Sequence, residues 1–183
     1  MDRRQRKTRE AVFAAFTELL AKKEYEKITV GEIIIRADIG RATFYAHFET
    51  KDDLLKELCA ELFCHIADVA ASNESGHRHI FTCDEQDDVF CHLFRHLKQN
   101  DNRVLQLLSG RNNVLFLQMF KTNLRKLVVT QLPRFSHRKS ECLPEDFWTD
   151  HITAVFVETV RWWVDNGLRE SPETITTYFF LSV

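Results

Sequence analysis

Residues 28–55 constrain the fold of this chain more than any other segment, because they read as two short helices joined by a tight turn. Thr29 and Glu32 have the spacing of a capping box, in which the two side chains satisfy free amides at a helix start. Asp38 and Gly40 then interrupt the helical pattern, since Asp tolerates left-handed backbone and Gly is an acceptable N-cap. The segment therefore predicts a helix-turn-helix motif, with a longer helix directly after it.

The second helix of this motif, residues 41–48, has a buried and an exposed side. Phe44 and Phe48 supply the apolar side together with Ile39 before them. The exposed side is polar and basic at its start, and consists of Arg41, Thr43, Tyr45 and His47. A second helix of this kind is suited to lie in the major groove of DNA.

These residues resemble the DNA-binding domain of the TetR family of bacterial transcriptional regulators. The resemblance is carried by Thr-Phe-Tyr-x-His-Phe at residues 43–48 and by a flanking set: Thr29, Val30, Ile33, Ala37, Lys51 and Leu54. Two positions depart from the pattern: Asp38 replaces the usual turn Gly, and Gly40 replaces the usual cap Ser, so no phosphate contact is expected from the side chain at position 40.

The resemblance implies an all-α, TetR-like fold in two domains. Residues 1–50 would form a three-helix DNA-binding domain, and residues 51–183 a helical effector-binding and dimerisation domain. Apolar residues recur at helical spacing along the second part and predict helices near 51–72, 85–99, 102–109, 112–131 and 145–166. A last helix is expected after Ser171, which has the N-cap position with Pro172 behind it. No alternating strand pattern competes.

Three residues at the start of the second motif helix are the candidate base readers. Arg41 is the strongest, because Arg pairs bidentately with guanine O6 and N7. Ala42 is small enough to face a thymine methyl group, and Thr43 can touch base or phosphate.

Contacts to the DNA backbone come from a second set of residues. The resemblance assigns them to Thr29, Tyr45, His47 and Lys51. Ordinary half-buried contacts are the alternative for Tyr45. Residues 1–9 hold five basic residues and one acidic residue, and a basic segment just before a DNA-binding motif favours phosphate contacts through Arg4 and Lys7. A solvated basic terminus is the alternative there.

The helix expected over 145–166 is apolar on more than one face and should be buried on two sides. In the TetR family the last two long helices pair with those of a second subunit, so the resemblance implies a homodimer interface at Ile152, Phe156, Val160 and Trp163. An intramolecular core is the alternative.

Trp162 to Gly167, followed by Ser171-Pro172, also resembles the C-terminal part of members that activate dihydroxyacetone-kinase operons.

Family precedent implies a one-component repressor that binds a palindromic double-stranded DNA operator as a dimer and responds to a small apolar effector. Phenylalanines that could line an effector pocket, or serve as plain core, are Phe81, Phe90, Phe94, Phe116 and Phe120. An activator, or an adaptor with a protein partner on the same fold, is the alternative. With no long apolar run and no apolar segment after the basic start, the expectation is a cytoplasmic chain without a membrane partner.

No enzyme motif appears: the chain has no nucleophile elbow, phosphate-binding loop or HExxH sequence, so no catalytic residue is predicted. His92 and His96 stand one helical turn apart, with His77, His79 and Cys83 before them, and such residues can bind zinc. No complete ligand set with a known spacing emerges, however. The sequence therefore predicts no metal and no cofactor, and leaves open whether His92 and His96 bind a metal.

Overall fold

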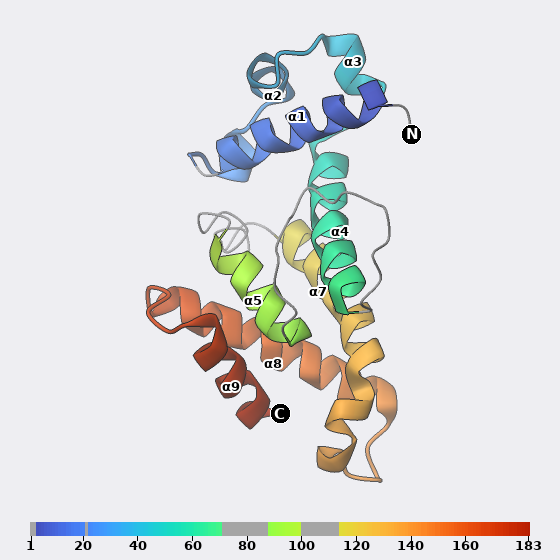
Figure 1. Cartoon of the computed structure of the whole chain (residues 1–183), viewed down its shortest axis with the longest axis vertical. Coiled ribbons are helices and arrows are strands. Elements are labelled where there is room, and N and C mark those ends of the chain that lie inside the picture. The colour runs from blue at the N-terminus through green and yellow to red at the C-terminus, as the bar shows by residue number, and fades with distance from the viewer. Residues whose placement is uncertain (1–2, 21, 71–87, 100–113) are drawn as a thin grey trace. The chain divides into compact units, whose positions relative to one another are not determined.

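A computed structural model describes residues 3–20, 22–70, 88–99 and 114–183 (Figure 1). Over these residues all regular structure is helical, as the sequence predicted. The chain divides into two compact units, Met1–Glu61 and Leu62–Val183. The division falls within helix α4 (Lys51–Ala70) and not at residue 51, so the buried residues Leu54, Leu55 and Leu58 belong to the first unit. No described helix is long and apolar enough to cross a membrane.

The first unit contains α1 (Arg3–Leu20), the 3-10 helix η1 (Tyr25–Lys27), α2 (Val30–Arg36), α3 (Arg41–Tyr45) and the first part of α4 (Figure 1). One stripe of α1 is buried and consists of Val12, Phe13, Ala15, Phe16, Leu19 and Leu20. Helix α1 packs against α2, and α2 against α3. The unit is therefore a small helical domain whose core holds α2 and α3 in place.

The turn between α2 and α3 confirms the local reading of the sequence. Asp38 has φ of 52°, the left-handed conformation that ends a helix. The amides of Asp38 and Ile39 reach back to the carbonyls of Ile35 and Ile34 at 3.3 and 3.2 Å, which is the Schellman pattern. At the other end of α2 the predicted capping box of Thr29 and Glu32 is present. These two devices fix where α2 begins and ends.

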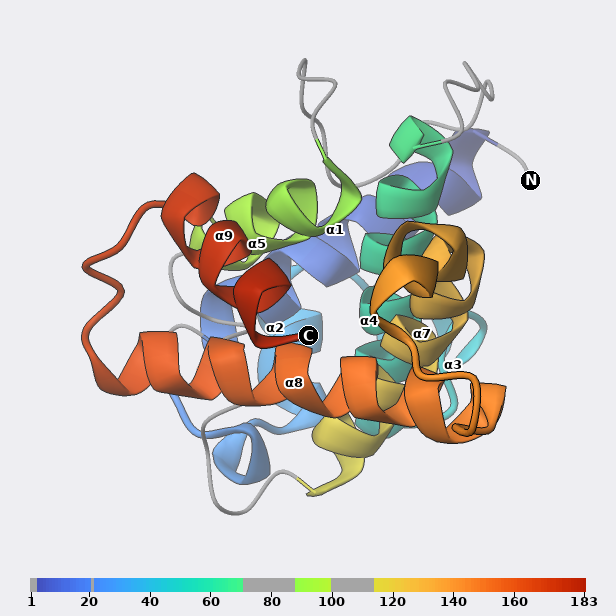
Figure 2. The same ribbon diagram turned by 90° about the horizontal axis from the view of Figure 1, so that it is seen from below.

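The second unit contains the rest of α4, α5 (Val89–Gln99), α7 (Val114–Gln131), the 3-10 helix η2 (Leu132–Arg138), α8 (Glu145–Asp165) and α9 (Pro172–Ser182). Helix α9 packs against both α5 and α8, and α8 also packs against α7 (Figure 2). The segment between the helices predicted at 112–131 and 145–166 begins with η2. The helix predicted at 102–109 and residues Phe81, His77, His79 and Cys83 lie outside the described residues.

An aromatic core joins the helices of the second unit, with Phe156 of α8 at its centre. The Phe156 ring lies 4.5 Å from that of Phe94, 5.3 Å from Phe179, 5.9 Å from Phe90 and 6.5 Å from Phe120, measured between centroids. Phe90, Phe94, Phe116 and Phe120, which the sequence offered as a pocket lining or as core, are all buried in this way. They serve as core.

The predicted dimer-interface residues need a correction for the same reason. Ile152, Phe156, Val160 and Trp163 each have 0% of their surface exposed within a single chain. A side chain that is fully covered by its own chain has no area left to bury against a partner. The apolar faces of α8 are satisfied by α5, α7 and α9, and these four residues belong to the protomer core.

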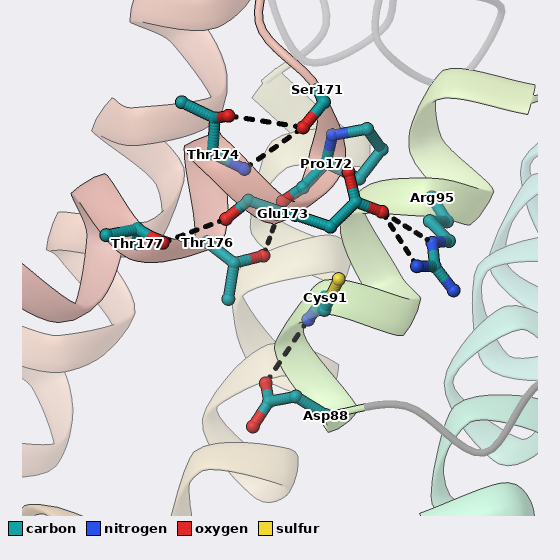
Figure 3. A network of polar contacts seen from close by, with 9 residues as sticks. All are labelled: Asp88, Cys91, Arg95, Ser171, Pro172, Glu173, Thr174, Thr176 and Thr177. Carbon is teal, nitrogen blue, oxygen red and sulfur yellow. Dashed lines mark hydrogen bonds and ion pairs between the residues drawn. The ribbon is translucent and has the colours of Figure 1, made fainter.

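The connection from α8 to α9 also follows from its sequence. Gly167 has φ of 70° and ends α8 in the left-handed conformation. The Ser171 hydroxyl then accepts a hydrogen bond from the Thr174 amide at 3.2 Å, with Pro172 as the first residue of α9. Figure 3 shows that the Arg95 guanidinium of α5 donates to the Glu173 carboxylate, at 2.7 and 3.1 Å. This ion pair joins the start of α9 to α5.

Candidate nucleic-acid interface

The start of α3 presents the three predicted base readers to solvent. Arg41, Ala42 and Thr43 are all exposed, whereas Phe44 is fully buried one residue later. Gly40 is the N-cap with extended backbone, and no side chain caps the helix there. Buried Phe44 thus fixes the rotation of α3 so that the Arg41 side chain points away from the core.

Tyr45 and His47 lie on the same short segment, and the structure treats them differently. Tyr45 is 50% exposed, and its ring lies edge-on to Phe44 at 5.4 Å. His47 is half-buried, with its ring 6.2 Å from that of Phe48. Helix α3 ends at Tyr45, shorter than the expected 41–48, so His47 belongs to the turn that leads to α4.

Lys51 is occupied inside the protein. Its ammonium group donates to the backbone carbonyls of Tyr25 at 2.9 Å and Ile28 at 3.0 Å, with that of Glu26 at 3.4 Å. It also lies 4.3 Å from the centre of the Tyr25 ring, a cation–π arrangement. Three donors thus face three carbonyls at the end of η1. Lys51 joins the start of α4 to η1, a role that the sequence analysis, which assigned it to phosphate, did not foresee.

Thr29 is likewise committed to a local bond. Its hydroxyl accepts from the Glu32 amide and lies 3.2 Å from the Glu32 carboxylate, to which it donates. The single hydroxyl proton is therefore used within the capping box. A contact between Thr29 and phosphate would have to replace this bond.

The basic segment at the start of the chain is helical and not an extended arm. Helix α1 begins at Arg3, and both Arg4 and Lys7 are exposed on its first turns. Arg9 differs from them: its guanidinium pairs with Glu57 at 2.6 Å and lies 5.4 Å from the centre of the Phe48 ring. Arg4 and Lys7 thus remain available to a polyanion, while Arg9 stabilises the unit itself.

Tyr25 is the residue of this unit that sequence reasoning missed. It is buried, its hydroxyl donates to the Asp52 carboxylate, and its ring receives the Lys51 ammonium. Burial, followed by the hydrogen bond from its hydroxyl to Asp52, raises the pKa of the Tyr25 phenol. A single aromatic residue in the otherwise charged stretch at residues 22–27 was the only signal for it.

Both units of the chain match known protein families. Residues 12–58 match the family described as bacterial regulatory proteins, tetR family, and residues 84–182 match a transcriptional regulator C-terminal region. The chain belongs to the TetR family of transcriptional regulators. The relatives that it matches are described as transcriptional regulators and not as enzymes.

Individual relatives agree with this assignment. The chain is 40% identical to YxbF, an uncharacterised HTH-type transcriptional regulator of Bacillus subtilis strain 168; the match covers 100% of this chain and 47% of that protein, so the chain spans about half the length of this relative. It is also similar to a TetR regulator structure from Streptococcus agalactiae 2603V, at 32% identity and a TM-score of 0.72, over 100% of this chain and 96% of the other.

A third relative bears on the expected likeness to dihydroxyacetone-kinase regulators. DhaS, a dihydroxyacetone kinase operon activator, matches at 18% identity with a TM-score of 0.64, over 96% of each chain. At this identity the match shows a shared fold.

Proposed function

We propose that this TetR-family protein is a homodimeric repressor that binds a palindromic operator through α3. The observation that carries the proposal is the exposed Arg41-Ala42-Thr43 sequence at the start of α3, held by buried Phe44. Arg at this position can read guanine in the major groove, and its two neighbours are small enough to let the helix approach the bases. Exposed Arg4 and Lys7 of α1 would add sequence-independent phosphate contacts.

The dimer is proposed to form through the outer faces of α8 and α9. Apolar side chains remain exposed there: Trp162 at 47%, Tyr178 at 41% and Leu181 at 75%. Trp162 and Tyr178 are in edge-to-face contact at 5.9 Å, next to a groove of about 550 Å³ between the two helices. One helix-turn-helix reads few base pairs, so a two-fold dimer on a two-fold site supplies useful affinity.

The second unit is proposed to receive the regulatory signal. The described phenylalanine rings pack against one another in the core, so the lining of a pocket for a small apolar effector must come from other residues. A groove of about 500 Å³ between α7 and α8 is one such place, lined in part by Val114, Leu117 and Ala154. Binding there would change operator affinity by its preference for one of two arrangements of the protein.

Replacing Arg41 with Ala tests the base-reading assignment. Operator fragments are first selected from genomic DNA with the purified wild-type protein. Arg41→Ala should then weaken binding to them by about 5- to 150-fold, equal to about 1–3 kcal/mol, and relax specificity at one position of each half-site. Arg169→Ala, which removes the same charge from an exposed position of the second unit, is the control and should bind like wild type.

Two results would contradict the proposal. If Arg41→Ala binds the selected fragments with wild-type affinity and specificity, α3 does not read bases through this residue. If the wild-type protein selects no fragment, DNA reading fails altogether and the adaptor alternative, with a protein partner, takes its place.

A further inference from the structure

Three buried histidines meet in the second unit, whereas the proposed DNA-binding residues all belong to the first unit. His65 lies on α4 after the division between the units, and His92 and His96 lie one turn apart on α5. Their exposed fractions are 4%, 4% and 3%. Burying three imidazoles together is costly unless their polar nitrogens are satisfied, so this arrangement calls for a physical reason.

Ring nitrogens of the three histidines lie close together. His96 Nε2 lies 3.0 Å from His65 Nε2 and 2.8 Å from His92 Nε2, and one ligand nitrogen from each ring lies within 4.8 Å of the others. A ring nitrogen carries either one hydrogen or one lone pair. His96 Nε2 can therefore form a good hydrogen bond with one of the two neighbouring nitrogens, but not with both at once.

We infer that His65, His92 and His96 form a binding site for a divalent transition-metal ion of the zinc class. A central cation can be bound by all three nitrogens at once, because each neutral ring has one nitrogen with a lone pair to offer. Zn–N bonds of about 2.0–2.1 Å in a tetrahedral site place the nitrogens about 3.3 Å apart, so the two short contacts to His96 need to lengthen by only about 0.3–0.5 Å. The spacing of His92 and His96 by four residues puts both on one helix face.

The chemistry of the donor set selects the class of ion. Three neutral imidazoles suit zinc, copper, nickel or iron, whereas magnesium and calcium prefer oxygen ligands. Three protein ligands leave a fourth position for water or another donor.

Metal binding is measured on the full chain after treatment with EDTA. Competition with a chromophoric chelator should give one tightly bound Zn²⁺ per chain. His96→Gln removes the nitrogen shared by both short contacts and should weaken binding at least about 100-fold, because losing a ligand costs no less than losing a partner that orients one. His151→Gln, an exposed histidine on α8, is the matched control and should bind Zn²⁺ like wild type.

Cobalt supplies a second measurement that does not depend on a folded variant. Co²⁺ bound by three imidazoles should give intense visible absorption in the wild-type protein and should shift the NMR signals of three histidine rings. Wild type without a stoichiometric site for Zn²⁺ would overturn the inference. So would Co²⁺ that leaves the ring signals in place, or a folded His96→Gln variant that binds Zn²⁺ with undiminished affinity.

Discussion

Replacing Lys51 with Met separates two roles for this residue, a clamp within the first unit and a contact to DNA phosphate. The ammonium group has carbonyl partners at 2.9, 3.0 and 3.4 Å and an aromatic ring at 4.3 Å. A hydrogen bond to a charged group contributes about 1.5–3 kcal/mol, and an exposed cation–π contact about 0.5–1 kcal/mol. Lys51 is half-buried, so water can hydrogen-bond to part of the exposed carbonyl groups when the ammonium is removed, and the net loss of stability is smaller than the sum of these contributions.

We therefore expect Lys51→Met to lower the free energy of unfolding by about 2 kcal/mol. With a denaturant slope of about 1–3 kcal/mol/M for a small domain, the urea midpoint of the first unit should fall by about 1 M. Hydrogen exchange at the amides of η1 and of the start of α4 locates the loss. Lys56→Met is the matched control, since it removes an exposed lysine from the same helix and should change neither measurement.

The same pair of variants decides whether the Lys51 ammonium also neutralises phosphate. A phosphate contact contributes about one unit to the slope of log affinity against log salt. Since the ammonium is engaged with carbonyls, Lys51→Met should leave this slope unchanged. A variant with the wild-type urea midpoint and a slope reduced by about one would refute the clamp and restore the phosphate contact.

Two further predictions concern the second unit. Trp162→Glu places a charge on the proposed dimer face, so sedimentation should show a monomer, and operator binding should be weaker. The control Val129→Glu on α7 should remain a dimer. A dimeric Trp162→Glu protein would mean that the interface lies elsewhere. Hydrogen bonding from Ser171 and the Arg95 guanidinium lower the pKa of Glu173 from 4.5 to about 2, so the folded state favours its charged form. The stabilisation by charged Glu173 is present above pH 4.5 and is lost as the pH falls toward 2. Because the side chain is 55% exposed, Glu173→Gln should lower the free energy of unfolding by no more than about 1 kcal/mol at pH 7 and should have no effect at pH 2. Chemical unfolding at both pH values measures this difference.

Local sequence patterns predicted the DNA-binding motif closely. The capping box at Thr29, the left-handed turn at Asp38 and the exposed start of α3 are all present, and each depends on residues within a few positions of one another. The same holds for the N-cap at Ser171. The observed helix limits differ from the predicted ones by a few residues, because the first and last turns of a helix depend on tertiary contacts that the local sequence pattern does not show.

The partners of individual side chains could not be predicted in this way. Lys51 stands where the family pattern places a DNA contact, yet its ammonium meets carbonyls more than twenty residues earlier in the chain. His92 and His96 were visible as a pair, but the third ring, His65, comes from another helix. Only the placement of α5 against α4 joins them.

By itself, the sequence determined that the chain is helical and that it carries a helix-turn-helix with Arg41 at the start of its second helix, because helical periodicity, caps and turns are local properties. The tertiary structure decided what the doubly apolar helix α8 covers. An apolar face can be buried equally well by the same chain or by a second copy, and the hydrophobic effect alone does not distinguish them. In this protein α5, α7 and α9 cover Phe156 completely, so the proposed dimer has to use exposed residues on the outer faces of α8 and α9.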